Sequence, residues 1–177
     1  KDALLSITTG GENTALGSGA LASVIGGSYN IGVGKGAGDA LTTGSSNIAI
    51  GQDALGLSTD VDYSVAIGRG AMSQANVVGA GNCDYTVAVG FFALANLVGG
   101  SDSGKYNTAI GTSTLGLLST GEANTALGYN ALSAADGGET HNTCLGYSAG
   151  YTIDGGDQNT CLGSITRPSA STGNDQI

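Results

Sequence analysis

The sequence has few of the residues from which a globular core or a cationic binding surface is built. It contains no tryptophan, two phenylalanines, one proline and only five lysine and arginine residues among 177. So few bulky aromatic residues are unusual for a globular domain. The 14 acidic residues give a net charge of −9 at pH 7. This balance argues against nucleic acid as a partner, because nucleic-acid binding needs a basic surface, and against an anionic membrane surface.

Several kinds of chemistry are also missing. No apolar run approaches the ~20 residues of a membrane-spanning helix, so no membrane insertion is expected in this segment. His141 is the only histidine, and without a second histidine or a cysteine pair at ligand spacing it predicts neither a zinc site nor a catalytic triad. We expect it to be a solvated turn residue.

Two glycine-rich stretches have only a superficial likeness to ligand-binding loops. Residues 32–38 resemble a phosphate-binding loop, but Lys35 is followed by glycine instead of serine or threonine, and no helix follows. Asp154 and Asp157 flank a Gly-Gly pair without the spacing of a calcium loop. We therefore predict no catalytic, cofactor-binding or metal-binding residue, and we predict that the protein is not an enzyme.

Glycine, by contrast, is abundant, with 33 residues, and one set of glycines is regularly spaced. The successive intervals in this set are 17, 17, 17, 22, 21, 17, 18 and 17 residues, which is typical of a repeat architecture. We predict a single repeat array over residues 1–177, with about ten coils, cut within a repeat at both ends, and with insertions near residues 69–85 and 95–105. The glycines of the set are Gly17, Gly34, Gly51, Gly68, Gly90, Gly111, Gly128, Gly146 and Gly163.

Each of these glycines ends the same short pattern, of which Thr125-Ala126-Leu127-Gly128 is a clear copy. A β-branched residue, a small residue and an aliphatic residue before glycine predict a short strand that ends in a tight bend. A second Ala-Leu pair, here Ala131-Leu132, indicates a second wall. Seventeen residues are too few for a βαβ unit, which needs about 30. The predicted fold is therefore an all-β parallel β-solenoid, or β-roll, of 17-residue coils with two or three short strands each.

The alternation of side chains along a strand places the β-branched and aliphatic columns on one face and the small column on the other. We expect the threonine-rich column to face inward, and each coil to enclose a thin core of leucine, isoleucine, valine and alanine. The small column would lie against the opposite wall of the coil or a neighbouring chain. Because so thin a core gives little stability by itself, we also expect association with sister chains.

An asparagine precedes the strand in most repeats, with Ser64 and Thr86 in its place in two of them. This column is either a ligand-binding row of amides or a structural ladder of stacked side chains, and the ladder is favoured because buried polar groups are normally hydrogen-bonded. The residues predicted to define the repeat are Asn13, Gly17, Asn47, Gly51, Gly68, Gly90, Asn107, Gly111, Asn124, Gly128, Asn142, Gly146, Asn159 and Gly163.

Tyr63, Tyr85 and Tyr106 precede the strand in three consecutive repeats around the insertions. They could line a sugar-binding ridge or stack on one another and stiffen the rod. Insertions in solenoids map to loops on one face, often the binding face. We therefore take the three tyrosines, with Asp102 in the second insertion, as candidate receptor contacts.

Cys144 and Cys161 are 17 residues apart in the small column, where all other repeats have alanine or glycine. Their expected separation of about 5 Å would permit a disulfide. The column favours two buried thiols that replace alanine. Cys83 lies in the longest insertion, and the repeat does not explain it.

The pattern at Ser64-Val65-Ala66-Ile67-Gly68, with its Asn-Thr-Ala-Ile/Leu-Gly variants, resembles the head repeats of trimeric autotransporter adhesins (YadA-like heads). It is more similar to the Asn-Thr-Ala-Ile-Gly-x-x-Ala-Leu repeats of tail-fibre-like proteins of bacteriophages and large viruses. The resemblance implies a left-handed β-roll and a homotrimeric fibre, displayed outside a cell or on a virion and used for attachment. The 17-residue period is longer than that of the adhesin heads. The neck, stalk and membrane anchor of the adhesins are not in this sequence, which favours the viral fibre.

Three classes of function follow. The first is a trimeric attachment fibre whose partners are its own copies and a host receptor or glycan, with no cofactor. The second is a purely structural shaft or self-assembling extracellular filament without receptor binding. The third is an ice- or polysaccharide-binding solenoid with a flat threonine row, which is weakened because Ile31, Ile48, Val65 and Val87 interrupt that row.

Overall fold

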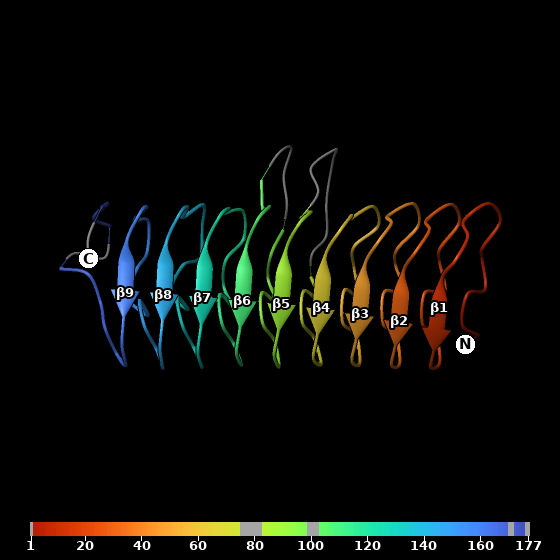
Figure 1. Cartoon of the computed structure of the whole chain (residues 1–177), viewed down its shortest axis with the longest axis horizontal. Helices are drawn as coiled ribbons and strands as arrows, with labels where there is room; N and C mark the ends of the chain where they lie inside the picture. Colours follow the sequence, from red (N-terminus) through yellow and green to blue (C-terminus); the bar gives the residue numbers. More distant parts are fainter. Residues whose placement is uncertain (1, 75–82, 99–102, 170–171, 176–177) are drawn as a thin grey trace.

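The computed structural model describes residues 2–74, 83–98, 103–169 and 172–175, which form an all-β solenoid. Nine parallel strands of three residues lie in chain order in a single sheet. Figure 1 shows them side by side along the long axis, all pointing the same way. The prediction of an all-β parallel solenoid is thereby confirmed. The strands are β1 (Thr14–Leu16), β2 (Ile31–Val33), β3 (Ile48–Ile50), β4 (Val65–Ile67), β5 (Val87–Val89), β6 (Thr108–Ile110), β7 (Thr125–Leu127), β8 (Thr143–Leu145) and β9 (Thr160–Leu162).

The register places like residues over like along the whole sheet. Ala49 pairs with Ala66, and Ile50 with Ile67, across the regular 17-residue interval. The same columns stay paired across the 22-residue interval, where Val65 lies beside Val87. The register of the sheet is therefore the same on both sides of the insertion.

The described residues contain one strand per coil, which corrects the expectation of two or three. The second wall is built of turns because its large residue adopts a left-handed backbone conformation, as at Leu94, Leu115 and Leu132 with φ of 48°, 51° and 51°. A pleated strand requires negative φ. Hydrogen bonds still join the coils on this side, with the Leu115 N–H donating to the Ala131 carbonyl at 3.0 Å. All three leucines are fully buried, which compensates for the backbone strain.

The inward face of the sheet is the small column, so the expectation that the threonine-rich column faces inward was wrong. Ala66 and Ala126 are fully buried, whereas Leu127 is 46% exposed. The reason is the opposite wall, whose leucines fill the coil. At the glycine of the small column, Gly32, an added Cβ would lie 2.7 Å from Cγ of Leu21. The interior therefore has room only for small side chains on the sheet side. The larger residues in the core come from the turns, including Leu41, Val61, Leu97, Leu118 and Ile153.

This packing predicts that Ala126→Leu lowers the free energy of unfolding by roughly 1–3 kcal/mol through overpacking. The matched control is Ala134→Leu, because Ala134 is half-buried and the equivalent position of other coils is Leu57 or Leu117. It should change stability by less than about 0.5 kcal/mol. Guanidinium unfolding followed by circular dichroism measures both. Equal stability of the two variants would mean that the small column has free space beside it.

The asparagine column forms a buried ladder of hydrogen bonds. The Asn124 Nδ2 donates to Oδ1 of Asn107 at 3.1 Å and to the Glu139 carbonyl at 2.7 Å. In turn, the Asn124 Oδ1 accepts from the backbone N and the Nδ2 of Asn142 at 3.0 and 3.2 Å. All three asparagines are fully buried. Each side chain thus joins its own coil to both neighbouring coils.

Hydroxyl groups replace the amides in the two coils with long insertions. Ser64 Oγ donates to the Cys83 carbonyl at 3.1 Å and accepts from the Thr86 N–H at 3.2 Å. Thr86 Oγ1 donates to the Gly104 carbonyl at 3.2 Å. The column thereby remains hydrogen-bonded where the chain leaves the regular repeat.

Within the described residues, no helix has the length and apolar character needed to cross a membrane.

Candidate functional site

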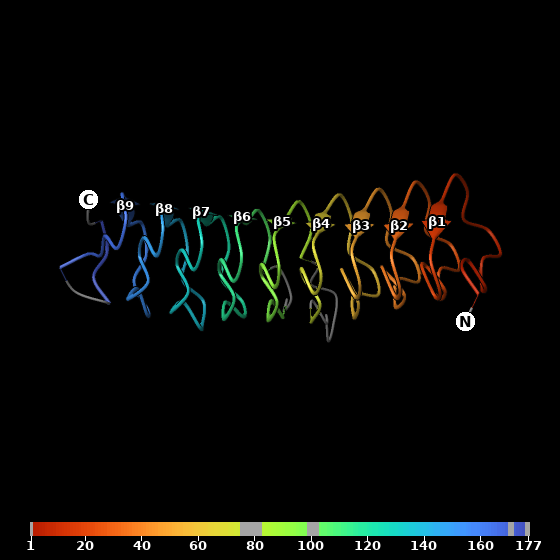
Figure 2. The same ribbon diagram turned by 90° about the horizontal axis from the view of Figure 1, so that it is seen from below.

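The outer sheet face, defined as the first and third residues of strands β1–β9, is an apolar surface that extends along the rod. Figure 2 shows the strands along one long side of the molecule. All 18 residues are threonine, isoleucine, valine or leucine, and all are exposed or half-buried. A chain with a net charge of −9 therefore has a long surface without a charged side chain. Its most exposed aliphatic residues are Leu16, Ile31, Ile50, Ile110, Leu127, Leu145 and Leu162.

The three candidate receptor tyrosines form a stack. The ring centroids of Tyr63 and Tyr85 are 5.2 Å apart, and those of Tyr85 and Tyr106 are 5.6 Å apart, with nearly parallel planes. Both faces of the Tyr85 ring are thus covered by protein, which leaves ring edges and hydroxyls exposed. This arrangement has the stacking geometry that would stiffen the rod and lacks an open ring face on Tyr85 for a sugar. Asp102 lies outside the described residues.

A second tyrosine stack was not singled out in the sequence. Tyr129 and Tyr147 follow the closing glycines of β7 and β8, and their centroids are 5.3 Å apart. The signal was present, since both residues occupy the same repeat position. At this position, other coils have Lys35, Gln52 or Arg69, so the stack is local to two coils.

A side groove of about 520 Å³ crosses the coils of β4–β7 beside the second wall. It combines one aromatic ring, that of Phe92, with side-chain amides and hydroxyls. Sequence reasoning missed it because the groove exists only when four coils are stacked. The lining residues are Ser73, Gln74, Phe92, Ala95, Asn96, Ser113, Gly116, Leu117, Asn130 and Ser133.

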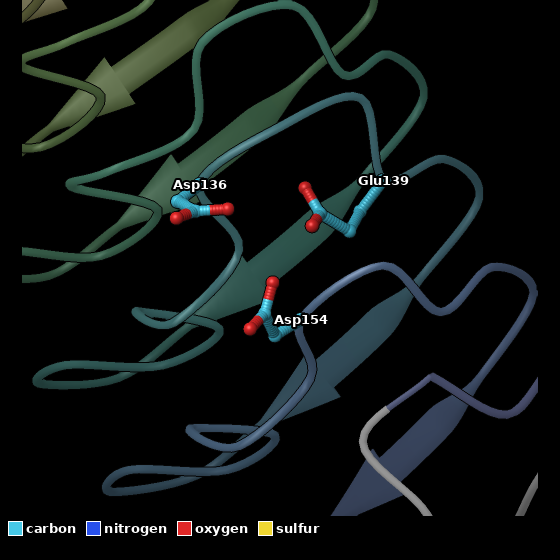
Figure 3. Close-up of side chains that lie close together, drawn as sticks. All are labelled: Asp136, Glu139 and Asp154. Atoms are coloured by element: carbon cyan, nitrogen blue, oxygen red, sulfur yellow. The ribbon is translucent and has the colours of Figure 1, made fainter.

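Three carboxylates converge between the turns that follow β7 and β8. Asp136, Glu139 and Asp154 each bring an oxygen within 4.8 Å of the others, and Figure 3 shows the three groups pointing toward one another. Oxygen ligands of this kind suit a hard cation. However, both oxygens of the buried Glu139 already accept backbone N–H groups, from Gly137 at 3.1 Å and Gly155 at 2.8 Å. The cluster therefore has a structural role and does not establish a metal centre.

The other residues considered for chemistry lie apart. Asp157, paired with Asp154 in the calcium-loop comparison, instead accepts from the Thr140 N–H at 2.6 Å. His141 is exposed in a turn, as expected. Lys35 is exposed beside the closing glycine of β2. Asp157, His141 and Lys35 therefore do not belong to a shared site.

Cys144 and Cys161 are register partners in β8 and β9, and both thiols are buried and form no disulfide. Burial, with a smaller contribution from the neighbouring Cys161, raises the pKa of Cys144 far above its usual value. Burial also raises the pKa of Cys161. Both therefore remain neutral thiols at physiological pH, as the interpretation of cysteine in place of alanine requires. Cys83 is likewise buried and forms no disulfide.

Comparisons with known proteins give the chain no relative from which to transfer a function. No protein-family model, curated protein or solved structure matches it.

Proposed function

We propose that this chain is a segment of a homotrimeric fibre, displayed outside a cell or on a virion, that attaches to a host or other surface. The observation that carries the proposal is the outer sheet face, which is apolar, uncharged and exposed along all nine strands. Large contiguous apolar surfaces on soluble proteins mark sites of association. The threonine, isoleucine, valine and leucine side chains of this face therefore pack against a partner in the working protein.

A second copy of the chain is the partner that fits this surface. The apolar columns recur once per coil along nine strands in register, so a partner must repeat with the same spacing along the same length. Another copy of the chain has the same sequence and therefore the same repeat spacing. Most soluble oligomers are symmetric assemblies of identical chains. The number three comes from the resemblance of the Ser-Val-Ala-Ile-Gly pattern to trimeric fibre repeats.

The surface outside the outer sheet face favours the attachment fibre and not the purely structural shaft. If the outer sheet faces meet at the fibre axis, the turns and the side groove stay exposed along the outside of the fibre. The ice-binding alternative gains an outward threonine column that was not expected. Threonines are register partners from β6 to β9, but Ile31, Ile48, Val65 and Val87 take their place in β2–β5, so the threonine row does not extend along the rod.

The assembly is tested with the double variant Ile110→Lys/Leu127→Lys. Both residues are exposed on adjacent strands of the outer sheet face, so the charges should leave the coil intact and prevent association, since burying unpaired ammonium groups is strongly unfavourable. We expect a trimer for the unaltered chain and a monomer for the variant in native mass spectrometry and light scattering.

The control is Ile25→Lys/Leu57→Lys, which adds the same charge at two equally exposed aliphatic residues, each 48% exposed, outside the strands. It should remain trimeric. An unaltered chain that is monomeric at micromolar concentration would contradict the fibre. Two double variants that assemble equally well would show that copies meet elsewhere.

A further inference from the structure

We propose that the side groove binds an uncharged oligosaccharide. This inference deepens the proposed attachment function, on which it rests for its biological role, by naming the class of ligand and the residues that contact it. The groove lies beside the second wall and not on the outer sheet face, so assembly through that face leaves it accessible.

The lining of the groove suits hydroxyl groups and does not suit ions. Its polar side chains are three amides, of Gln74, Asn96 and Asn130, and three serine hydroxyls. Each of these groups can both donate and accept hydrogen bonds, as sugar hydroxyls do. Among the described residues, none that lines the groove is charged, although the chain has 19 charged residues. An anionic ligand would find no cation here, and a cationic ligand would find no carboxylate.

The amides are available to a ligand. Within the described part of the chain, the side chains of Gln74 and Asn130 have no protein hydrogen-bond partner. Asn96 is oriented by a bond from its Nδ2 to the Gly116 carbonyl at 2.6 Å, which leaves its Oδ1 as an acceptor in a fixed position. The groove thus combines one preoriented amide with two adaptable ones.

Phe92 supplies the apolar surface against which the C–H face of a sugar ring can pack. Its side chain is 37% exposed, and its ring covers Gly70 of the preceding coil, where any Cβ would meet the ring carbons. Phe91 contacts it edge-on, with centroids 4.4 Å apart, and the Arg69 guanidinium lies 5.7 Å from the Phe91 centroid. The phenyl ring is therefore held in place before a ligand arrives.

The groove is large enough to hold a small ligand. A volume of about 520 Å³ lies within the range of small-molecule sites, roughly 300–1,000 Å³. The groove also crosses four coils, so an extended oligosaccharide could contact the amides of successive coils along the rod.

The proposal is tested by saturation-transfer NMR and calorimetry on the intact chain. The probes are cellotetraose, mannotetraose and chitotetraose, with a sulfated tetrasaccharide as the anionic comparison. We expect at least one uncharged probe to bind, and Phe92→Ala and Gln74→Ala each to weaken that binding about tenfold or more. The control Tyr29→Ala removes an exposed aromatic side chain that neither lines the groove nor belongs to its coils, and it should bind within about threefold of the unaltered chain.

Failure to bind any uncharged probe, preference for the sulfated probe, or equal losses in Tyr29→Ala and Phe92→Ala would each overturn the proposal. Gln74 is exposed and has no side-chain hydrogen bond to another described residue, so its variant remains informative if Phe92→Ala does not fold. If the chain is trimeric but binds no sugar, only the proposal of sugar binding in the side groove is contradicted. If the chain binds sugar as a monomer, only the proposal of a homotrimeric fibre is contradicted.

Discussion

Gly51→Ala is expected to destabilise the solenoid more than any surface substitution, by about 3–4 kcal/mol or more. Gly51 closes β3 with φ of +128°, a conformation that L residues rarely adopt. A Cβ there would lie 2.6 Å from both the carbonyl carbon and oxygen of Gly68, and 3.0 Å from the backbone nitrogen of Arg69. Because the obstructing atoms are backbone, no side-chain rotation can relieve the overlap. The coils of β3 and β4 would have to separate at this bend.

Guanidinium unfolding monitored by far-ultraviolet circular dichroism measures this loss. The matched control is Gly11→Ala, since a Cβ on Gly11 meets nothing within 4 Å and its φ is not in the left-handed region. It should change stability by less than about 0.5 kcal/mol. If Gly51→Ala were as stable as Gly11→Ala, the closing glycines would not be stacked in contact, and the close approach of successive bends would be wrong.

Asn124→Ala is expected to lower the free energy of unfolding by about 3–5 kcal/mol, because it leaves buried partners without hydrogen bonds. The Glu139 carbonyl loses its donor from Nδ2, and the Asn142 backbone N–H loses its acceptor. The Oδ1 of Asn107 loses one of its two donors. Each buried group left unsatisfied costs about 1–3 kcal/mol.

Two further variants separate this effect from a general loss of packing. Asn13→Ala, at the partly buried first position of the ladder, removes a bond to the Gly27 carbonyl and one from the Asn30 N–H, and water can replace part of them. Asn124→Ser should recover part of the lost stability, since Ser64 bridges two coils through its hydroxyl. Thermal and guanidinium unfolding rank the stabilities of Asn124→Ala, Asn124→Ser and Asn13→Ala. A loss in Asn124→Ala no larger than that in Asn13→Ala would contradict a continuous buried ladder.

These two columns explain how so thin a core forms a rod. The glycine bends bring successive coils into contact, and the asparagine ladder joins each coil to the next through buried hydrogen bonds. Stability in such arrays is roughly a sum of nearest-neighbour terms. A substitution in either column should therefore weaken two interfaces, whereas a substitution at an exposed turn should weaken neither.

The candidate surfaces differ in how far sequence could reveal them. The stacking of Tyr63, Tyr85 and Tyr106 was one of two interpretations of a regular column, because residues at equal repeat positions must lie near one another. The side groove had no such signal. Phe92 is isolated in its column, and the amides of Gln74 and Asn130 belong to different columns, so their convergence depends on how the coils stack beside the second wall.

By itself, the sequence determined the all-β solenoid, the position of the strand that precedes each repeat glycine and the register of the sheet. Nine copies of one local pattern allow only one alignment that places glycine over glycine and asparagine over asparagine. Only the tertiary structure decided which face of the strand is interior. Alternation separates Ala126 from Thr125 and Leu127, but the inward side depends on the opposite wall. There the left-handed backbone at Leu132 and its counterparts directs large side chains into the coil. Because that wall fills the interior, alanine faces inward and the apolar columns face outward, where a second chain can reach them.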